Sequence, residues 1–320
     1  MKALVTDSTH SILPQKLRSA GFEVVVDATL SYERLLSLVD DFDILVVRSK
    51  VPIDKHFIDS CHRLKCIGRV GAGMETIDVD YAERRGITCL NSPEGNCDAV
   101  GEHTLGLLLS LFDHIARADA EVRGGLWQRE LNRGVEVKGK KIGIIGYGHM
   151  GASFASRLAG FQCQVLAYDL LGKSAMGFSH PLPYVQCVTL RQLMDEADVL
   201  SLHVPLTPLT HYMVNAEFID AFAKPFYLIN TSRGAVVNTA HLADALDNGK
   251  VCGAALDVVE YEDMTKDGLR SDQFPQPFQT LLHSPHTVLS PHVAGWTVES
   301  RYKLASVLAD KIIQRFILES

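Results

Sequence analysis

The feature that most constrains the fold is an alternation of short apolar runs with amphipathic stretches along nearly the whole chain. In the first hundred residues the β-branched apolar runs are 3–5, 23–26, 43–47, 66–70 and 87–90. Between them lie stretches such as 32–39, in which Leu35, Leu36 and Val39 have helical spacing. Strands separated by helices in this way predict βαβ units and therefore a parallel sheet.

A second series of the same kind begins at Lys141. Its predicted strands are 141–146, 164–168, 199–203, 226–230 and 252–257. Between the two series, 98–118 is predicted to be one long helix, buried along most of its length because its apolar face is nearly continuous. The segment 261–286 lacks periodicity and is predicted to be a long surface loop, and 298–318 a final helix. The sequence therefore predicts an α/β protein with two doubly wound, Rossmann-like parallel-sheet domains and an active site in the cleft between them.

Composition and charge narrow the class of protein. The 320 residues are 47% hydrophobic and 22% charged, which excludes a disordered or collagen-like chain. The net charge of −7 argues against a general nucleic-acid binder, and the longest apolar runs fall far short of the ~20 residues of a membrane span. The start of the chain has no export signal, and seven irregularly spaced cysteines without C-x-x-C predict neither disulfides nor zinc. We expect a cytoplasmic protein with no bound metal, no nucleic-acid partner and no membrane partner.

Residues 146–151, Gly-Tyr-Gly-His-Met-Gly, lie between a predicted strand and a predicted helix. Each glycine has a physical reason in a turn that binds a dinucleotide. Gly146 allows the tight turn, Gly148 lets the backbone approach a pyrophosphate, and Gly151 allows the helix to pack closely on the strand. The context of the motif favours this interpretation over an ordinary glycine-rich turn.

The residues around this turn complete the predicted cofactor site. The backbone N–H groups of His149 and Met150 lie at a helix N-terminus, where an anion is stabilised. Asp169 ends the next strand and can accept hydrogen bonds from ribose hydroxyls. Because this carboxylate would repel a 2′-phosphate, we predict NAD as the cofactor rather than NADP.

Four further motifs lie at or after the C-terminal ends of predicted strands, where open α/β sheets bind ligands. They are LHVPLTPLT (202–210), INTSRGAVVN (229–238), GAALDVVEYED (253–263) and LSPHVAGW (289–296). Three of these motifs contain the candidate reactive groups Arg233, Glu262 and His292. Each alone fits an ordinary surface residue, but their order behind the glycine turn favours an active site.

From about Arg48 to its end, the chain resembles the D-2-hydroxyacid dehydrogenase family. The resemblance rests on GRVGAGMETID, NSPEGNCDAVGEHTLGLLL, the glycine turn with Asp169, NTSRGAVVN, DVVEYED and SPHVAGW. It implies a flavodoxin-like substrate domain of residues 1–98 plus 291–320, with an NAD-binding domain of 99–290 inserted into it. It also implies a homodimer, with the apolar helix 98–118 as a contact.

The resemblance also implies the roles of individual residues. Arg233 would hold the substrate carboxylate and polarise the C2 oxygen, because its planar fork fits both groups. His292 would take the hydroxyl proton during oxidation and return it during reduction, and Glu262 would fix its ring and favour its charged form. Asp257 would contact the nicotinamide carboxamide. Besides the glycine turn, Asp169, Asp257, Arg233 and His292, the residues implied at the cofactor are Thr104, His203, Val204, Pro205, Thr231, Ser232, Ala294 and Gly295.

The motifs VVRSK, IGRVGAGMETID and NSPEGN are most similar to 3-phosphoglycerate dehydrogenases, in which arginines of the first domain meet the phosphate. Arg48 and Arg69 stand at strand ends here, although structural salt bridges would also explain them. The loop 70–73 would offer backbone N–H groups to a carboxylate. The residues implied at the substrate are Arg48, Ser49, Arg69, Val70, Gly71, Ala72, Gly73, Arg233, His292 and Trp296.

We therefore expect an NAD-dependent 3-phosphoglycerate dehydrogenase acting on a small 2-hydroxy or 2-keto acid. Erythronate-4-phosphate, glyoxylate, hydroxypyruvate and D-lactate are alternative substrates, and an NAD-sensing corepressor-like binding protein is the alternative from another class. Two positions depart from the family pattern: Asp263, where proline is usual, and Trp296, where many relatives have a small residue. The chain ends soon after the final helix, so we expect no appended regulatory domain.

Overall fold

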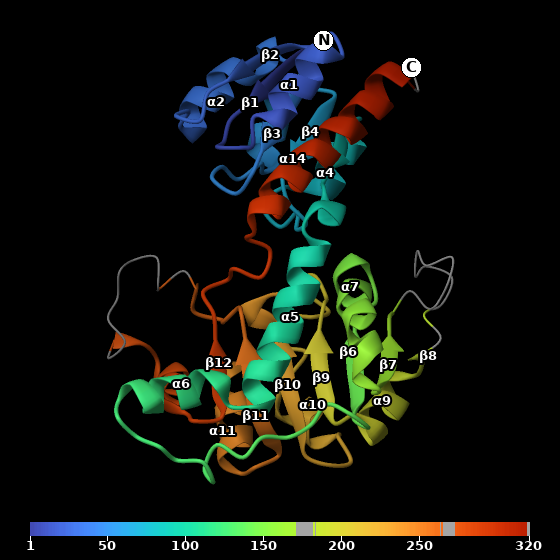
Figure 1. Cartoon of the computed structure of the whole chain (residues 1–320). Helices are drawn as coiled ribbons and strands as arrows, with labels where there is room; N and C mark the ends of the chain where they lie inside the picture. Colours follow the sequence, from blue (N-terminus) through green and yellow to red (C-terminus); the bar gives the residue numbers. More distant parts are fainter. Residues whose placement is uncertain (171–181, 183, 263, 265–272, 319–320) are drawn as a thin grey trace. The chain divides into compact units, whose positions relative to one another are not determined.

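The computed structural model describes residues 1–170, 182, 184–262, 264 and 273–318 (Figure 1). The chain forms two compact units, Met1–Asp98 with Trp296–Ser320, and Ala99–Gly295. Residues 291–295, which the sequence analysis assigned to the first domain, belong to the second unit. The reason is local, because the N–H groups of Val293 and Ala294 donate to Asp257 in that unit.

The first unit is built on a parallel five-stranded sheet in the order β2-β1-β3-β4-β5. Its strands are β1 (Lys2–Val5), β2 (Glu23–Val26), β3 (Ile44–Val47), β4 (Cys66–Arg69) and β5 (Thr88–Leu90). Its helices and short helical turns are α1 (Ile12–Ser19), α2 (Tyr32–Leu38), η1 (Val39–Asp41), α3 (Lys55–Asp59), α4 (Val79–Arg84), η2 (Pro93–Gly95), α14 (Val298–Ile313) and η6 (Gln314–Leu318). The order is flavodoxin-like and confirms the predicted fold of this part.

Both faces of this sheet are buried, which explains the near-continuous apolar runs of its strands. In β3, Ile44 and Val46 pack in the same core as Leu308 of α14. Leu45 and Val47 alternate with them and pack in the opposite core with residues such as Phe57 of α3. The period-2 alternation of a strand therefore feeds two cores.

The second unit is built on a parallel seven-stranded sheet in the order β12-β11-β10-β9-β6-β7-β8. Its strands are β6 (Lys141–Ile145), β7 (Gln164–Tyr168), β8 (Val185–Cys187), β9 (Val199–Leu202), β10 (Phe226–Asn230), β11 (Val251–Leu256) and β12 (Thr287–Leu289). Its helices and helical turns are α5 (Cys97–Phe112), which starts at the unit boundary, α6 (Ile115–Arg123), α7 (His149–Arg157), η3 (Leu158–Phe161), α9 (Leu190–Glu196), α10 (Ala216–Asp220), η4 (Gly234–Val236), α11 (Thr239–Asp247) and α13 (Gln276–His283). The strand order reverses between β6 and β9, which is the point where open sheets of this kind bind ligands.

Two expectations about individual elements were wrong, and two short strands were not predicted. The predicted helix 98–118 is two helices, because the chain turns at His114, whose φ is +53°. The first of them, α5, lies across one face of the seven-stranded sheet (Figure 1) and buries half of its residues, whereas α6 buries none. The predicted loop 261–286 contains α13, whose Phe278 and Leu281 lie on one buried face. The short strands β8 and β12 were missed because three residues carry little pattern.

None of the helices in the described part of the chain is long and apolar enough to cross a membrane.

Candidate active site

The glycine turn lies after β6, beside the end of β9. Gly146 has a φ of +90°, and a Cβ there would lie 2.4 Å from the carbonyl oxygen of His203. A Cβ at Gly151 would lie 2.1 Å from the carbonyl oxygen of Gly146, so α7 packs directly on the turn. Gly148 is the N-cap of α7 and has open space beside its Cα. This is the shape that backbone approach to a bulky phosphate requires.

The polar groups at this turn fit NAD. Gly148 supplies no capping side chain to α7, and the amides of His149 and Met150 belong to the first turn of the helix, where a bound anion would be stabilised. Asp169 follows β7 and accepts a 2.8 Å hydrogen bond from the N–H of Tyr147, which holds its carboxylate beside the turn. These residues would hold the pyrophosphate and the adenosine ribose respectively.

His203, which was predicted at the cofactor, lies beside the glycine turn. Its Nε2 lies 2.9 Å from Ser201 Oγ, and the ring centroid lies 5.8 Å from that of Phe154. Burial lowers the pKa of His203 to about 3, so the ring is neutral. The carbonyl of His203 is the group that meets the glycine turn.

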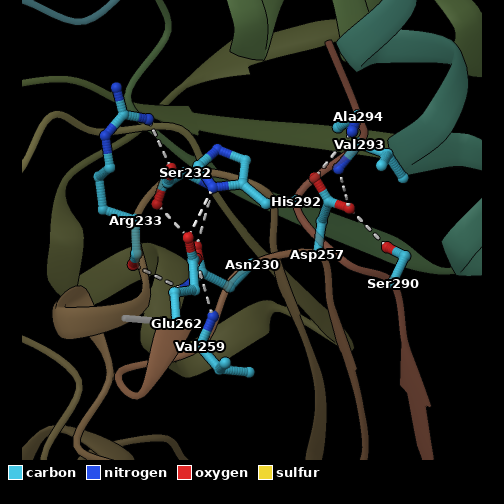
Figure 2. Close-up of polar contacts among 10 residues, drawn as sticks. All are labelled: Asn230, Ser232, Arg233, Asp257, Val259, Glu262, Ser290, His292, Val293 and Ala294. Atoms are coloured by element: carbon cyan, nitrogen blue, oxygen red, sulfur yellow. Dashed lines mark hydrogen bonds and ion pairs between the residues drawn. The ribbon is translucent and has the colours of Figure 1, made fainter. Parts of the chain in front are cut away.

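His292 and Glu262 form a hydrogen-bonded pair at the ends of β12 and β11 (Figure 2). His292 Nδ1 lies 2.7 Å from Glu262 Oε2, and the His292 side chain is 50% exposed. The backbone of His292 is left-handed, with a φ of +54°, and its N–H donates to the carbonyl of Asp257 at 2.7 Å. Because Nδ1 is engaged by the carboxylate, Nε2 is the ring atom that can meet a substrate.

The surroundings of His292 favour its protonated form. The hydrogen bond that Glu262 accepts from His292 raises the pKa of His292 above its ordinary value, against the opposing effect of burial. The charges of Glu262 and Asp257 add to the rise, and the charge of Arg233 opposes it. An imidazole poised in this way suits a general acid–base.

Arg233 follows β10, and its backbone is fixed by Asn230. Asn230 Nδ2 donates to the carbonyl of Arg233 at 2.9 Å, and Asn230 Oδ1 accepts from both the N–H and the hydroxyl of Ser232. The guanidinium donates through Nη1 to the carbonyl of Ser232 at 2.6 Å. The next residue, Gly234, packs so closely on the following loop that a Cβ would lie 2.0 Å from the carbonyl oxygen of Val259. The segments of Arg233 and Glu262 are therefore in direct contact.

Asp257 has partners other than the predicted nicotinamide carboxamide. Its side chain is only 1% exposed and accepts from the N–H groups of Val293 and Ala294, at 2.9 and 2.8 Å (Figure 2). Ser290 Oγ donates to it at 2.6 Å, and His103 Nε2 lies 3.4 Å away. Burial alone would raise the pKa of Asp257, but these hydrogen bonds outweigh it and hold the pKa low.

This carboxylate ties the loop of His292 to β11. Ser290 and His103 were missed by the sequence analysis, and the only signal for them was their position beside His292 and Thr104.

The other residues predicted at the cofactor differ in burial: some are buried and some are at least partly exposed. Thr104 is fully buried, with its hydroxyl 3.1 Å from that of Thr231, and therefore supports Thr231 from within. Ser232 and Ala294 are buried as well. The residues of this set with exposed or partly exposed surface are Val204, Pro205, Thr231 and Gly295. No group of three metal-ligating side chains occurs among the residues that the structure describes.

In the first unit, the candidate substrate residues follow β3 and β4. The guanidinium of Arg48 lies 4.7 Å from the ring centroid of Trp296, which is 69% exposed. Arg69 folds back along its own loop, so that Nη1 lies where a side chain of Gly71 would begin. Ser49, which follows Arg48, is exposed.

The loop 70–73 uses part of its backbone internally. The N–H of Val70 donates to Val47 and that of Gly71 donates to Arg69. Only the amides of Ala72 and Gly73 therefore fit the predicted role of binding a carboxylate. Asn91 Nδ2 donates to the carbonyl of Ala72 at 2.6 Å and fixes the loop from behind.

Comparison with known proteins places this geometry in a family. Residues 105–294 match the family described as "D-isomer specific 2-hydroxyacid dehydrogenase, NAD binding domain". The chain is 33% identical over 313 residues to the D-3-phosphoglycerate dehydrogenase of Archaeoglobus fulgidus, covering 98% of this chain and 57% of that protein. It is 36% identical over 287 residues to the glyoxylate reductase of Thermofilum pendens, covering 88% of this chain and 81% of that protein.

A solved structure is similar to this chain in both fold and sequence. The TT0316 protein of Thermus thermophilus superposes with a TM-score of 0.77 at 31% identity, covering 97% of this chain and 94% of that one. The chain spans little more than half the length of the phosphoglycerate dehydrogenase that it matches. These findings confirm the predicted family: the chain belongs to the D-isomer-specific 2-hydroxyacid dehydrogenases and contains their NAD-binding domain.

Proposed function

We propose that the protein is an NAD-dependent dehydrogenase that interconverts a D-2-hydroxy acid and the matching 2-keto acid. The observation that carries this proposal is the His292–Glu262 pair, 2.7 Å apart, on loops in contact with the loop of Arg233. A proton-transfer group and an anion-binding group are the two elements that this reaction needs beside the cofactor. A corepressor-like binding protein would need neither a proton-transfer group nor an anion-binding group arranged for catalysis.

Each group has a defined part in the reaction. The oxidised cofactor, when bound, would take the hydride from C2 during oxidation, and the reduced cofactor would supply it during reduction. Arg233 binds the substrate carboxylate and polarises the C2 oxygen with its planar fork. His292 takes the hydroxyl proton at Nε2 during oxidation and returns it during reduction. Glu262 stabilises the imidazolium that carries this proton.

The substrate that we propose is 3-phosphoglycerate, with 3-phosphohydroxypyruvate as product. The support lies in the first unit, where Arg48 follows β3 and Arg69 ends the adjacent strand β4, and guanidinium groups are the side chains that bind phosphate in a planar fork. Glyoxylate is the alternative, because one similar relative is a glyoxylate reductase. The test is a panel of 2-hydroxy and 2-keto acids, with and without phosphate, assayed with NAD(H) and NADP(H). Absence of turnover with every acid would overturn the proposed function, and a preference for unphosphorylated acids would overturn only the substrate.

We also propose that the protein is a homodimer in the cytoplasm. The apolar side chains Ile115, Val122, Leu126, Trp127 and Leu131 on and after α6 are 49–78% exposed, which favours a protein contact at this surface. This shifts the expected contact from α5 to α6. None of the seven cysteines, all of which lie in the described part of the chain, forms a disulfide, which suits a reducing compartment. Light scattering of wild type and of a Trp127→Glu variant tests the dimer, since the variant should be monomeric.

A further inference from the structure

Glu260 lies two residues before Glu262, and both of its carboxylate oxygens accept hydrogen bonds from other segments. Tyr212 Oη donates to Oε1, and the N–H of Thr239 donates to Oε2 at 3.1 Å. Glu260 and Tyr212 are partly buried and Thr239 is buried, so these bonds are sheltered from water. A solvated acidic loop would not have two such partners at once.

The three residues come from three neighbouring strand ends. Tyr212 lies after β9, Thr239 is the first residue of α11 after β10, and Glu260 lies after β11. These strands are adjacent in the sheet, in the order β11-β10-β9. The carboxylate at the start of α11 is also favoured by the positive end of the helix. Glu260 therefore ties together three loops at the edge of the sheet where the His292–Glu262 pair lies.

The backbone of Tyr212, the residue whose hydroxyl donates to Glu260, is itself held in place. The N–H of Tyr212 donates to the carbonyl of Ala235 at 2.8 Å, with a left-handed φ of +49° at Tyr212. The hydrogen bond to Glu260 raises the pKa of Tyr212 to about 12, so its hydroxyl remains a donor throughout the working range of pH.

We propose that Glu260 is a positioning residue for catalysis, which fixes the segment 259–262 so that Glu262 reaches His292. The inference rests on the proposed acid–base role of that pair. The segment is held from outside at two successive residues, Val259 and Glu260, and a hydrogen bond within it orients Glu262. Gly234 packs against the backbone of Val259, Tyr212 and Thr239 bind Glu260, and the N–H of Val259 donates to Glu262 Oε1 at 3.2 Å.

Loss of this anchor should change the titration of His292. The groups that set the pKa of His292 are Glu262 and Asp257, which raise it, and Arg233, which lowers it. Asp257 is held by the loop 290–294 and Arg233 by Asn230, neither of which contacts Glu260 through a described hydrogen bond. Displacing the segment 259–262 therefore acts first on Glu262, while the hydrogen bonds that hold Asp257 and Arg233 remain in place.

The experiment compares Glu260→Ala, Glu260→Gln and Tyr212→Phe with wild type in the reduction of the best 2-keto acid. Glu217→Ala is the matched control, since Glu217 is an exposed glutamate in the first turn of α10. The measurements are kcat and KM between pH 5 and pH 9, the KM for NADH, and the thermal midpoint. We expect kcat of Glu260→Ala to fall about tenfold, as the loss of hydrogen bonds to a charged group implies. Its pH profile should move to lower pH, with the KM for NADH unchanged.

The two partial variants should show smaller effects of the same kind. The amide introduced by Glu260→Gln can accept only one of the two hydrogen bonds through its carbonyl, and Tyr212→Phe removes only one donor. A smaller displacement of the pH profile is expected for both, and none for Glu217→Ala. These variants keep most of the packing, so they test the inference even if Glu260→Ala folds poorly.

The same variants in a Glu262→Gln background separate the two proposals. If Glu260 acts through Glu262, adding Glu260→Ala to Glu262→Gln moves the pH profile no further. A Glu260→Ala enzyme with the wild-type profile, while Glu262→Gln alone shifts it, would overturn this inference and leave the proposed function standing. A fall in thermal midpoint alone would also overturn it. If Glu262→Gln itself leaves the profile in place, the proposed acid–base pair fails.

Discussion

The candidate side chains that follow the strands of the two sheets are held differently. In the seven-stranded sheet they bind groups of other loops, as when Asp257 holds the loop of His292 and Glu260 binds Tyr212 and Thr239. The loops of the five-stranded sheet are linked as well, by the hydrogen bond from Asn91 to the carbonyl of Ala72. In the five-stranded sheet, Arg48 lies on the face of Trp296 and Arg69 lies against Gly71 of its own loop. Both sheets are parallel, so the topology alone does not cause this difference.

The difference corresponds to two functions, proton transfer and substrate binding. Groups that move a proton must hold their geometry closely, and cross-linked loops provide this. Groups that bind one end of a substrate can tolerate longer, more mobile side chains, because their contribution is mainly affinity and selectivity. Substitutions in the seven-stranded unit should therefore affect turnover, and those in the five-stranded unit should affect the choice of substrate.

The largest effect is expected at Arg233. Arg233→Ala removes two charge-assisted hydrogen bonds to substrate, worth roughly 1.5–3 kcal/mol each, or about two to four orders of magnitude in kcat/KM. NAD binding should be nearly intact, as measured by titration calorimetry. Arg233→Lys should also fail, because a point charge cannot replace the fork. An alanine variant with most of its kcat/KM would remove Arg233 from the active site.

Asp257 should show the next largest effect. Asp257→Ala leaves two backbone N–H groups without their acceptor, and removing one partner of a buried charged network costs roughly 3–5 kcal/mol. For a unit of this size we expect the melting temperature to fall by about 6–20 °C and kcat to fall at least tenfold. Asp257→Asn keeps the shape and should be intermediate. If NAD affinity falls while kcat and the melting temperature remain, Asp257 contacts the cofactor after all.

Glu262→Gln tests the electrostatics of the acid–base pair. The hydrogen bond to Glu262 raises the pKa of His292 above about 6.5, so the imidazolium persists to higher pH in the wild type. Reduction needs this acid and falls as pH rises through the raised pKa, whereas oxidation needs the neutral base and rises there. In Glu262→Gln both profiles should move to lower pH, and reduction at pH 7 should lose several-fold. Superimposed profiles would separate Glu262 from His292.

The smallest effect is expected in the five-stranded unit. Arg48→Ala should penalise 3-phosphohydroxypyruvate more than glyoxylate. Trp296→Leu should do so more weakly, since an exposed cation–π contact is worth about 0.5–1 kcal/mol, or roughly two- to fivefold. Trp296→Phe keeps a ring face and serves as the matched control. Equal losses of kcat/KM on the two substrates would show that Arg48 and Trp296 have a structural role. A large loss of kcat on both substrates would contradict the proposed difference between the two units.

Much of the architecture followed from local pattern. Buried parallel strands are apolar over four to six residues, and this made β1, β3, β6 and β9 visible in the sequence. The glycine turn was equally clear, because Gly146 has a conformation and a close contact that other residues would not accept. The helix break at His114 was not visible, since a single left-handed residue leaves the apolar pattern on both sides intact.

The sequence by itself determined the two parallel sheets, the cofactor turn, and the identity of Arg233, Glu262 and His292 as candidates, because each depends on residue type and short-range spacing. Only the tertiary structure decided the separate roles of the three acidic residues after β11. Asp257, Glu260 and Glu262 lie within six residues of one another in DVVEYE, yet one holds the loop of His292, one anchors its own segment, and one pairs with the imidazole. Their partners come from the segments that follow β9, β10 and β12, and such long-range neighbours are set by the order of strands in the sheet.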